Sequence, residues 1–503
     1  MAQNKKHPLF NDQYFQAADM RKGRLVEMNI DPYPVGSKEL RRTHTCESFN
    51  EEFDYINDDN VDTEIKIRMT GKIVLWRNNG KMIFGNIQDV SDKRAQVFFS
   101  VSDTENYDLP KKTMTAGDII SVVGYPFRTQ KGELTLKVTN ATMASKAMTP
   151  PPEKFHGLQD EETKYRNRHL HMLSDPTVKQ TLLTRAKIIS IVRNFLNKKD
   201  FSEQETQVLQ EIAGGANARP FITHHNSLGA DRFLRIAPEL QLKKLLIGGI
   251  EKVYELNKCY RNEGVDATHN PEFTSVEFYE AYATYKQHMK MIEKLFKKIY
   301  RKVLGDKEYM LPYGELTINL DNWQKIPFRE ALLTIGNIPE DIIDEVEPLS
   351  MYLREQGVDK ANGTLPLGKL WEIAFDEFVE EKLIDPTFIT EYPVDISPLA
   401  RRNNKNPFLT DRFELFIAGR ELANGFNELN DPVDQYNRFQ AQVDGKDLND
   451  EDDESMVMDL SFIKALMSGM PPAAGTGIGI DRLVMLFTNK ASIRDVIAFP
   501  AMK

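Results

Sequence analysis

The chain has 503 residues, of which 65 are Lys or Arg and 75 are Asp or Glu, so its formal net charge is −10 at pH 7. The length predicts more than one domain, and the negative charge argues against a protein that coats nucleic acid by bulk electrostatics. The two cysteines exclude a disulfide framework and a thiolate zinc site.

The sequence has no apolar run near the roughly 18 residues that a membrane span needs, and its first residues lack the apolar region of a signal peptide. We therefore expect a chain that stays in the cytoplasm without a membrane partner. Residues 14–28 carry spaced apolar and basic side chains and stop before Pro32, which predicts a leading helix. This helix suits packing or RNA contact, and we assign residues 1–63 to an N-terminal helical extension.

Residues 64–149 contain five short segments of alternating apolar and polar residues with polar turns between them. This pattern predicts an OB-fold barrel, a fold that binds single-stranded nucleic acid by stacking bases on exposed aromatic rings. Phe84 on the second segment is the natural platform, although alternation alone favours a core position for it.

Three prolines at 150–152 interrupt helix and strand and indicate a linker. We expect residues 150–503 to form one domain of mixed strands and helices. Its first long element is a predicted amphipathic helix at 178–199.

Residues 251–261 and 271–279 are rich in strand formers and flank a polar loop, so they predict a long hairpin. Side chains two residues apart share a face of a strand. This spacing groups Arg261 with Glu263, and Phe273 with Glu277 and Tyr279. Together they offer a cation for phosphate, an aromatic ring for a base and carboxylates for amines.

Glycines alternate at 475, 477 and 479 in a predicted strand that leads into an apolar helix carrying Arg482. Such a strand leaves one face bare, so a flat ring or a phosphate chain can lie against its backbone. The Arg482 guanidinium can stack on a purine and donate to phosphate oxygens. Tight helix–strand packing would explain the glycines equally well, but the presence of Arg261 favours a nucleotide site.

The Arg261 hairpin and the 475–482 segment resemble motifs 2 and 3 of the class II aminoacyl-tRNA synthetases, and the chain is most similar to the bacterial type of class II lysyl-tRNA synthetase. The similarity covers nearly the whole chain and includes residues 214–226, 234–240, 269–273, 386–393, 397–401 and 419–431. It implies an α+β multidomain protein in which an OB-fold anticodon-binding domain precedes a class II catalytic domain with an antiparallel sheet flanked by helices.

The resemblance implies that ATP activates the carboxylate of lysine to lysyl-adenylate, after which tRNA(Lys) takes the lysyl group. Alignment and charge stabilisation suffice for this chemistry, and the expected catalytic residues are Arg261 and Arg482. An isolated His269 would equally suit a structural role. The expected ATP-binding residues are Arg261, Glu263, His269, Asn270, Phe273, Glu414, Glu421 and Arg482.

Glu414 and Glu421 lie seven residues apart in apolar strand settings, where a carboxylate is costly unless it is paired or bound to metal. Mg²⁺ prefers oxygen ligands from one or two carboxylates together with phosphates. We therefore expect these two residues to bind Mg²⁺ with ATP, and the alternative is an ion pair with an arginine such as Arg420.

For the lysine substrate, the resemblance implies that Glu239 binds the α-amine and that Glu428 with Tyr279 binds the ε-ammonium. Gln241 stands where a tyrosine often follows Pro-Glu-Leu, which affects access to the pocket or its affinity. The further residues expected to line or shape the lysine pocket are Gly215, Glu277, Asn424 and Phe426.

The barrel positions that match the anticodon contacts of lysyl enzymes are Arg77, Phe84, Gln96 and Glu133. This match reverses the preference for a buried Phe84 and implies recognition of a U-rich anticodon. The helix at 178–199 corresponds to motif 1, which implies a homodimer, although Gln207 replaces a proline that the family has there. The acidic stretch 447–455 suits a solvated loop.

Three alternatives stay open at this point. One is a synthetase paralogue that lysylates a protein, against which an apparently complete barrel argues. Another is a catalytically decayed RNA-binding relative, against which the intact charged residues argue. The third is an aspartyl or asparaginyl synthetase, and the acidic Glu428 at the pocket end argues against an anionic substrate.

Overall fold

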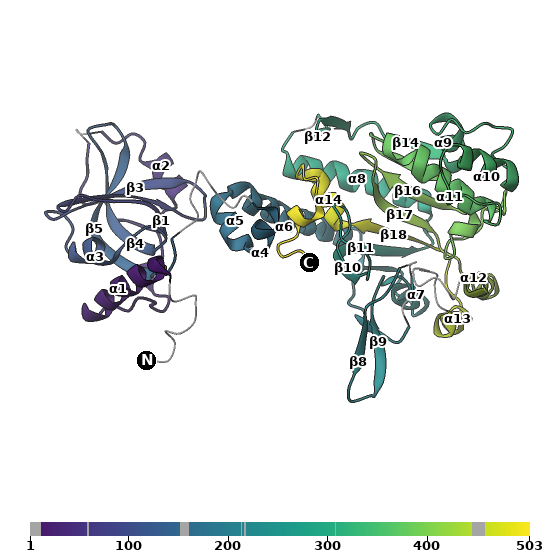
Figure 1. Cartoon of the computed structure of the whole chain (residues 1–503), viewed down its shortest axis with the longest axis horizontal. Coiled ribbons are helices and arrows are strands. Elements are labelled where there is room, and N and C mark those ends of the chain that lie inside the picture. The colour runs from purple at the N-terminus through teal and green to yellow at the C-terminus, as the bar shows by residue number, and fades with distance from the viewer. Residues whose placement is uncertain are drawn as a thin grey trace. The chain divides into compact units, whose positions relative to one another are not determined.

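The computed structural model describes residues 12–57, 60–150, 160–212, 214–215, 218–306, 308–444 and 458–502. The acidic stretch 447–455 and most of the linker predicted after residue 150 lie outside these ranges. Contacts divide the chain into two compact units, Met1–Pro176 and Thr177–Lys503 (Figure 1). This division assigns the short helices α4 (Glu161–Arg166) and α5 (Arg168–Ser174) to the first unit.

The first unit is built on a closed five-stranded barrel in the order β1-β2-β3-β5-β4. Its strands are antiparallel neighbours except for β3 and β5, which pair in parallel. This topology confirms the expected OB fold. The strands are β1 (Ile67–Asn78), β2 (Met82–Gln88), β3 (Arg94–Ser100), β4 (Ile119–Arg128) and β5 (Leu134–Ser145).

The barrel core follows the strand alternation, with Ile83, Ile87, Val97 and Phe99 fully buried. The helix predicted at 14–28 is α1 (Gln13–Glu27), which is capped by Asp12 and buries Leu25 in the barrel core cluster. The other short elements of this unit are η3 (Lys38–Leu40), α2 (Cys46–Glu52) and α3 (Asp108–Thr113).

The second unit is organised by an eight-stranded sheet in the order β14-β15-β16-β17-β18-β11-β10-β6. The expectation of an antiparallel sheet needs one correction, because β10–β6 and β14–β15, the pairs at the two edges, are parallel. The strands are β6 (Ser202–Glu203), β10 (Lys252–Tyr260), β11 (Glu272–Ala281), β14 (Gln324–Pro327), β15 (Thr387–Thr390), β16 (Arg412–Phe416), β17 (Glu421–Asn427) and β18 (Ala473–Gly479).

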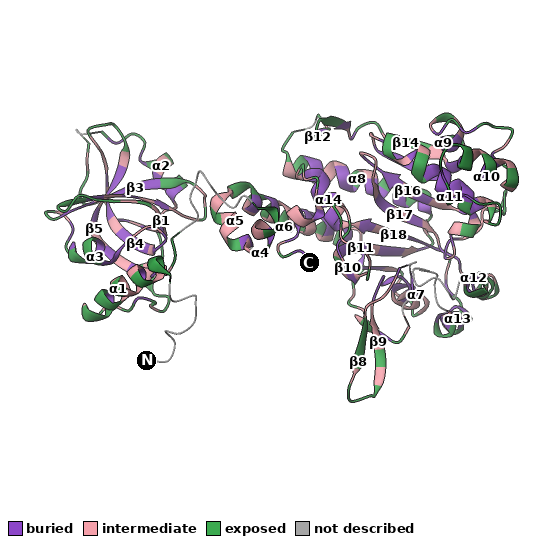
Figure 2. Cartoon of the chain, viewed as in Figure 1, coloured by how far each residue is buried: buried purple, intermediate pink, exposed green. Residues whose placement is uncertain are grey.

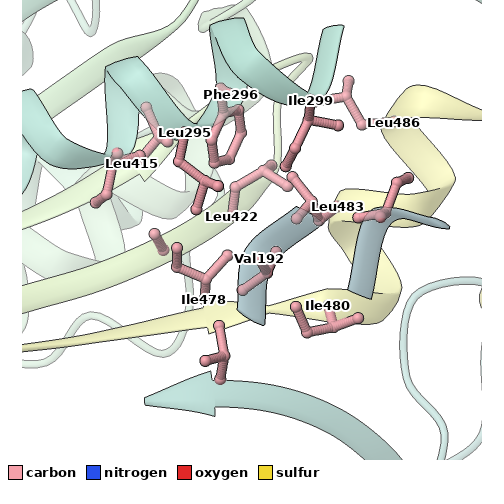
Figure 3. Packing of buried hydrophobic residues seen from close by; sticks show 14 of the residues in the cluster. Val192, Leu295, Phe296, Ile299, Leu415, Leu422, Ile478, Ile480, Leu483 and Leu486 are labelled. Atoms are coloured by element: carbon pink, nitrogen blue, oxygen red, sulfur yellow. The ribbon is translucent and has the colours of Figure 1, made fainter. Parts of the chain in front are cut away.

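One face of this sheet is covered by three helices, α6 (Pro176–Asn197), α8 (Tyr285–Val303) and α14 (Ile480–Phe487). Figure 3 shows apolar side chains of the sheet meeting those of the helices, and Figure 2 shows burial concentrated on the central strands and α8. The core side chains labelled in Figure 3 are Val192, Leu295, Phe296, Ile299, Leu415, Leu422, Ile478, Ile480, Leu483 and Leu486.

On β11 and β18, every second side chain points away from this core, and the cleft described below lies on that second face of the sheet.

A further core around Trp371 joins α9 (Phe328–Thr334), α10 (Val346–Glu355) and α11 (Leu367–Phe378). The remaining elements are β7 (Leu209–Gln210), β8 (Ile222–His225), β9 (Ala230–Leu234), α7 (Glu239–Ile247), β12 (Met310–Tyr313), β13 (Leu316–Asn319), η4 (Glu380–Lys382), η5 (Val394–Ile396), α12 (Pro432–Asp444), α13 (Leu460–Leu466) and α15 (Ile493–Val496).

Within the described ranges, no helix combines the length and the apolar character that crossing a membrane requires. Both cysteines, Cys46 and Cys259, are buried and free. Burial raises the pKa of each thiol to about 12, so both behave as small apolar core residues.

Candidate active site

A cleft on the open face of the sheet collects most of the residues expected to bind ATP and lysine. Its walls come from β10, β11, β17, β18, the start of α7 and the loop at 261–271. The expected residues that line it are Gly215, Glu239, Arg261, Glu263, His269, Asn270, Phe273, Glu277, Tyr279, Glu421, Asn424, Phe426 and Arg482. Glu414 lies in an adjoining hollow, Glu428 lies beneath Gly475, and Gln241 is not among the lining residues.

Arg261 and Phe273 stand where the hairpin of β10 and β11 opens into its loop. Strand β10 ends at Tyr260, so Arg261 and Glu263 lie in the loop and not on the strand face that the spacing predicted. The Arg261 guanidinium lies 5.1 Å from the centroid of the Phe273 ring. Its buried Nε has no hydrogen-bond partner among the residues that the structure describes, which leaves a charged donor unused in the cleft wall.

His269 is held from both sides of its ring. Asp266 accepts at 2.8 Å on the Nδ1 side, and Arg482 Nη2 lies 3.4 Å from Nε2. Burial alone would raise the pKa of Asp266, but hydrogen bonds from His269 and Thr268 hold it below its ordinary value. The ring is therefore oriented by the loop itself and presented next to Arg482.

The side chain of Asn270 is held by backbone groups on both sides of its amide. Its Nδ2 donates to the carbonyl of Glu272 at 2.6 Å, and its Oδ1 accepts from the backbone of Ala501 at 3.2 Å. The side chain is buried. Its amide therefore fixes the loop against the C-terminal residues while its surface lines the cleft.

The three alternating glycines of β18 have different surroundings. A Cβ added at Gly475 would lie 2.0 Å from Glu428 Oε1 and 2.4 Å from Tyr279 Cε1, whereas at Gly479 it would meet nothing closer than 3.9 Å. At Gly477 the nearest atom would be Glu277 Cγ at 3.6 Å. Close packing therefore requires the first glycine, and open space in the cleft lies over the other two.

Arg482 follows this strand and is tied to β17. Its Nη1 donates to the backbone carbonyl of Glu421 at 2.9 Å and pairs with Glu421 Oε2 at 3.2 Å. Arg482 and Phe273, the guanidinium and the aromatic ring expected to contact a base, both line the cleft.

Acidic side chains crowd the inner end of the cleft. Glu277 accepts a 2.8 Å hydrogen bond from the Tyr279 hydroxyl, and burial followed by the charge of Glu239 raises the pKa of Glu277 to about 8. Burial, with Glu239 and Glu277 nearby, raises the pKa of Glu428 to about 8 as well. The same groups raise the pKa of Tyr279 well above its ordinary value, so this hydroxyl stays neutral.

Sequence reasoning missed one cation in this region, Lys243 of α7. Its Nζ lies 2.6 Å from Glu239 Oε1 and 2.5 Å from Glu428 Oε2. The sequence feature that could have indicated Lys243 is its four-residue spacing from Glu239, which puts both residues on one face of a helix.

Glu414 and Glu421 border a hollow that adjoins the cleft at His269 and Arg482. Glu414 accepts from Arg412 at 2.5 Å and from the Tyr392 hydroxyl at 2.9 Å. Both carboxylates pair with an arginine, as the ion-pair alternative expected. The partners are Arg412 and Arg482, whereas Arg420, the example given for that alternative, donates to Tyr313.

This hollow holds more carboxylates than its arginines balance. Burial, with Glu421 nearby, raises the pKa of Glu414 to about 7, and burial with Asp376 nearby raises that of Glu380 to about 7. In the part of the chain that the structure describes, no group of three or more His, Cys, Asp or Glu side chains completes a metal site. Two carboxylates joined by phosphate oxygens are a donor set that fits Mg²⁺.

The four expected anticodon residues belong to the outer side of the barrel. Arg77 and Phe84 are cross-strand neighbours, and the Phe84 ring lies 4.7 Å from that of Phe98. Gln96 donates to Glu133 at 2.7 Å. Phe84 is half-exposed and is not part of the barrel core, so its position is that of an accessible stacking surface.

Comparison with known proteins adds to this geometry. The family model of tRNA synthetases class II (D, K and N) matches residues 160–503, and the model of an OB-fold nucleic acid binding domain matches residues 66–144. The chain is 47% identical over 500 residues to the lysine–tRNA ligase of Wolinella succinogenes, which covers 98% of this chain and 97% of that relative. It is 45% identical over 498 residues to the lysine–tRNA ligase of Helicobacter pylori, which covers 98% of both.

Proposed function

Since the chain belongs to the class II tRNA synthetases of the D, K and N group, we propose that it is a lysine–tRNA ligase, which activates L-lysine with ATP and transfers the lysyl group to tRNA(Lys). The observation that carries the choice of lysine is the acidic inner end of the cleft, where Glu239 and Glu428 are buried and Glu277 is half-buried. Buried carboxylates attract a substrate with two ammonium groups and disfavour the acidic or neutral side chains of aspartate and asparagine.

In the first step, the lysine carboxylate attacks the α-phosphorus of ATP, and the bond to pyrophosphate breaks. We assign Arg261 to the attacking carboxylate and the α-phosphate, which is supported by its buried and unused Nε. Arg482 and Phe273 would hold adenine between them, with Glu263 accepting from its exocyclic amine. His269 and Asn270 would meet the triphosphate beside Arg482.

Glu239 would accept the α-ammonium, and Glu428 with Tyr279 would accept the ε-ammonium, in a pocket shaped by Gly215, Glu277, Asn424 and Phe426. The depth of this burial supports the assignment, because a charged hydrogen bond is strongest where water is excluded. Glu414 and Glu421 would bind Mg²⁺ with the nucleotide, and the bound ion neutralises phosphate charge. Arg412 and Arg482 hold these two carboxylates in place.

For the second substrate, we assign residues 64–149 to anticodon binding and residues 150–503 to catalysis, with residues 1–63 as an extension of the barrel. The adjacent rings of Phe84 and Phe98, with Arg77, Gln96 and Glu133 on the same side of the barrel, support the anticodon assignment. We further propose a homodimer that works in the cytoplasm, where charged tRNA is used. The exposed Gln207 would lie near that interface.

The direct test is charging of tRNA by the full chain with radioactive lysine, ATP and Mg²⁺. We expect label in an acid-precipitable product that is sensitive to ribonuclease and labile to mild alkali, as an ester to ribose is. Label that stays in protein after ribonuclease treatment would support the paralogue that lysylates a protein. Absence of any labelled product would support the decayed RNA-binding relative.

A further inference from the structure

Lys243 is a fully buried cation that lies between the two carboxylates assigned to the substrate's ammonium groups. Its side chain has no exposed surface, and its Nζ contacts Glu239 at 2.6 Å and Glu428 at 2.5 Å. The rings of Phe426 and Phe462 lie 5.3 Å and 5.9 Å from the same Nζ. An ammonium in such a place is costly unless anions surround it.

Lys243 does more than stabilise helix α7 by pairing with Glu239, because it also contacts Glu428. An exposed pair at four-residue spacing contributes little to stability, but here a second anion, Glu428, comes from the loop after β17. Burial alone would lower the pKa of the Lys243 ammonium, but Glu239 and Glu428 outweigh this effect and raise it. The cation is therefore permanent in the free protein.

When all of its carboxylates are ionised, this region reaches charge balance only with substrate bound. Glu239, Glu277 and Glu428 carry three negative charges when ionised, and Lys243 supplies one positive charge. The nearby Glu255 is already paired with Arg235 at 2.6 Å, Tyr279 stays neutral, and Arg261 faces the substrate carboxylate. Two positive charges are missing, which is the number of ammonium groups that lysine carries.

From this geometry, and on the basis of the proposed function, we propose that Lys243 is a positioning residue for lysine recognition. Its ammonium orients Glu239 and Glu428 in the empty cleft and favours the ionised form of Glu428, so that each carboxylate retains an oxygen for one substrate ammonium. Both oxygens of Glu428 are buried without a hydrogen-bond partner within the described residues; Oε2 lies 2.5 Å from Lys243 Nζ, and Oε1 is the oxygen we assign to the substrate. An apolar residue of the same size would fill the space between Phe426 and Phe462 without holding either carboxylate.

The test is the pH dependence of lysine activation in Lys243→Met, measured by lysine-dependent ATP–pyrophosphate exchange with the full chain. Without the internal cation, three carboxylates face one another and take up protons at a higher pH. We expect the KM for lysine to rise at least about tenfold at pH 7, and this ratio to shrink as the pH rises to about 9. The kcat and the KM for ATP should change by no more than about twofold, since Lys243 contacts none of the residues assigned to ATP.

Lys244→Met is the matched control. The neighbouring ammonium is on the same helix but lies outside the cleft, where it donates to Ser461 at 3.0 Å. This variant should keep the wild-type KM for lysine at every pH. An unchanged KM in Lys243→Met, or a rise that does not depend on pH, would show a merely structural lysine and overturn the proposal.

If Lys243→Met does not fold, the double variant Lys243→Met with Glu239→Gln removes one positive and one negative charge. Recovery of the folded state, followed by circular dichroism, would support the charge balance, and failure to recover would overturn it. The wild-type protein separates this inference from the proposed function. If the wild type does not catalyse exchange with lysine, the proposed function is refuted. If the wild type is active and Lys243→Met has the same KM for lysine, only the role of Lys243 is refuted.

Discussion

Individual buried charges determine what the inner end of the cleft can accept. The resemblance of the sequence to lysyl enzymes was sufficient to single out Glu239 and Glu428, and both lie at that end. It was not sufficient to predict Lys243, because an acidic and a basic residue four apart are common on exposed helices, and only the fold brings Glu428 to the same ammonium. The amide of Asn270 likewise accepts a hydrogen bond from the backbone of Ala501, which is distant in sequence.

Substitution of Glu428 tests the lysine pocket. Glu428→Gln keeps the shape of the side chain but removes the charge that a buried ammonium requires. Breaking such a pair costs about 3 to 5 kcal/mol, so we expect the KM for lysine to rise roughly a hundredfold or more while the KM for ATP stays within about twofold. Steady-state exchange kinetics give both constants, and equal increases in the two would contradict the assignment of this residue.

The pH dependence of the wild-type enzyme follows from the same carboxylates. Burial raises the pKa of Glu277 and of Glu428 to about 8, so the free cleft takes up protons as the pH falls below that value. A bound ammonium favours the ionised form, and lysine binding therefore releases protons. The KM for lysine should fall about tenfold per pH unit from about pH 6 to about pH 8 for each proton released. A KM that is flat over this range would show that these groups are ionised before lysine binds.

Strand β18 shows which features of a single element the sequence pattern predicts and which it does not. The alternation of glycines predicted a strand with one bare face, and β18 (Ala473–Gly479) is that strand. The pattern did not separate a glycine that packs closely from one that borders open space, since this depends on the pairing of β18 with β11 and β17. The parallel edge pairs of the sheet were missed for a related reason, because alternation indicates a strand but not its partner.

Gly475→Ala tests the close packing of this strand. The added methyl group would lie 2.0 Å from Glu428 Oε1 and 2.4 Å from the Tyr279 ring, so both side chains must move out of the lysine pocket. We expect lysine-dependent exchange to fall by roughly a hundredfold or more. Gly23→Ala is the control, because a Cβ at this helical glycine meets nothing within 4 Å. Wild-type exchange in Gly475→Ala would contradict the described packing.

At the scale of the whole molecule, the chain combines a barrel with a catalytic unit that has its own core. Both folds were predictable, because five alternating segments and a set of ordered motifs each span many residues. The boundary of the first unit does not follow from the sequence. The sequence places a linker at residues 150–152, whereas the contacts group residues up to Pro176 with the barrel. If the barrel reads the anticodon, its loss should affect tRNA charging and not the activation of lysine.

Phe84→Ala tests this separation of roles. Stacking of a base on an aromatic side chain contributes about 1 to 3 kcal/mol, so we expect the KM for tRNA in the charging reaction to rise roughly tenfold or more. Lysine-dependent exchange, which needs no tRNA, should be unchanged. Val101→Ala is the control, because Val101 is 59% exposed on the same barrel. A fall in exchange in Phe84→Ala would show that the substitution damages the fold and not only the RNA surface.

The most direct test of the central claim is ATP–pyrophosphate exchange by the wild-type chain with the twenty amino acids offered singly, in the presence of Mg²⁺ and without tRNA. The acidic end of the cleft predicts exchange with lysine and with no other amino acid at comparable rates. Exchange with aspartate or asparagine in place of lysine, or with none of the twenty, would contradict it.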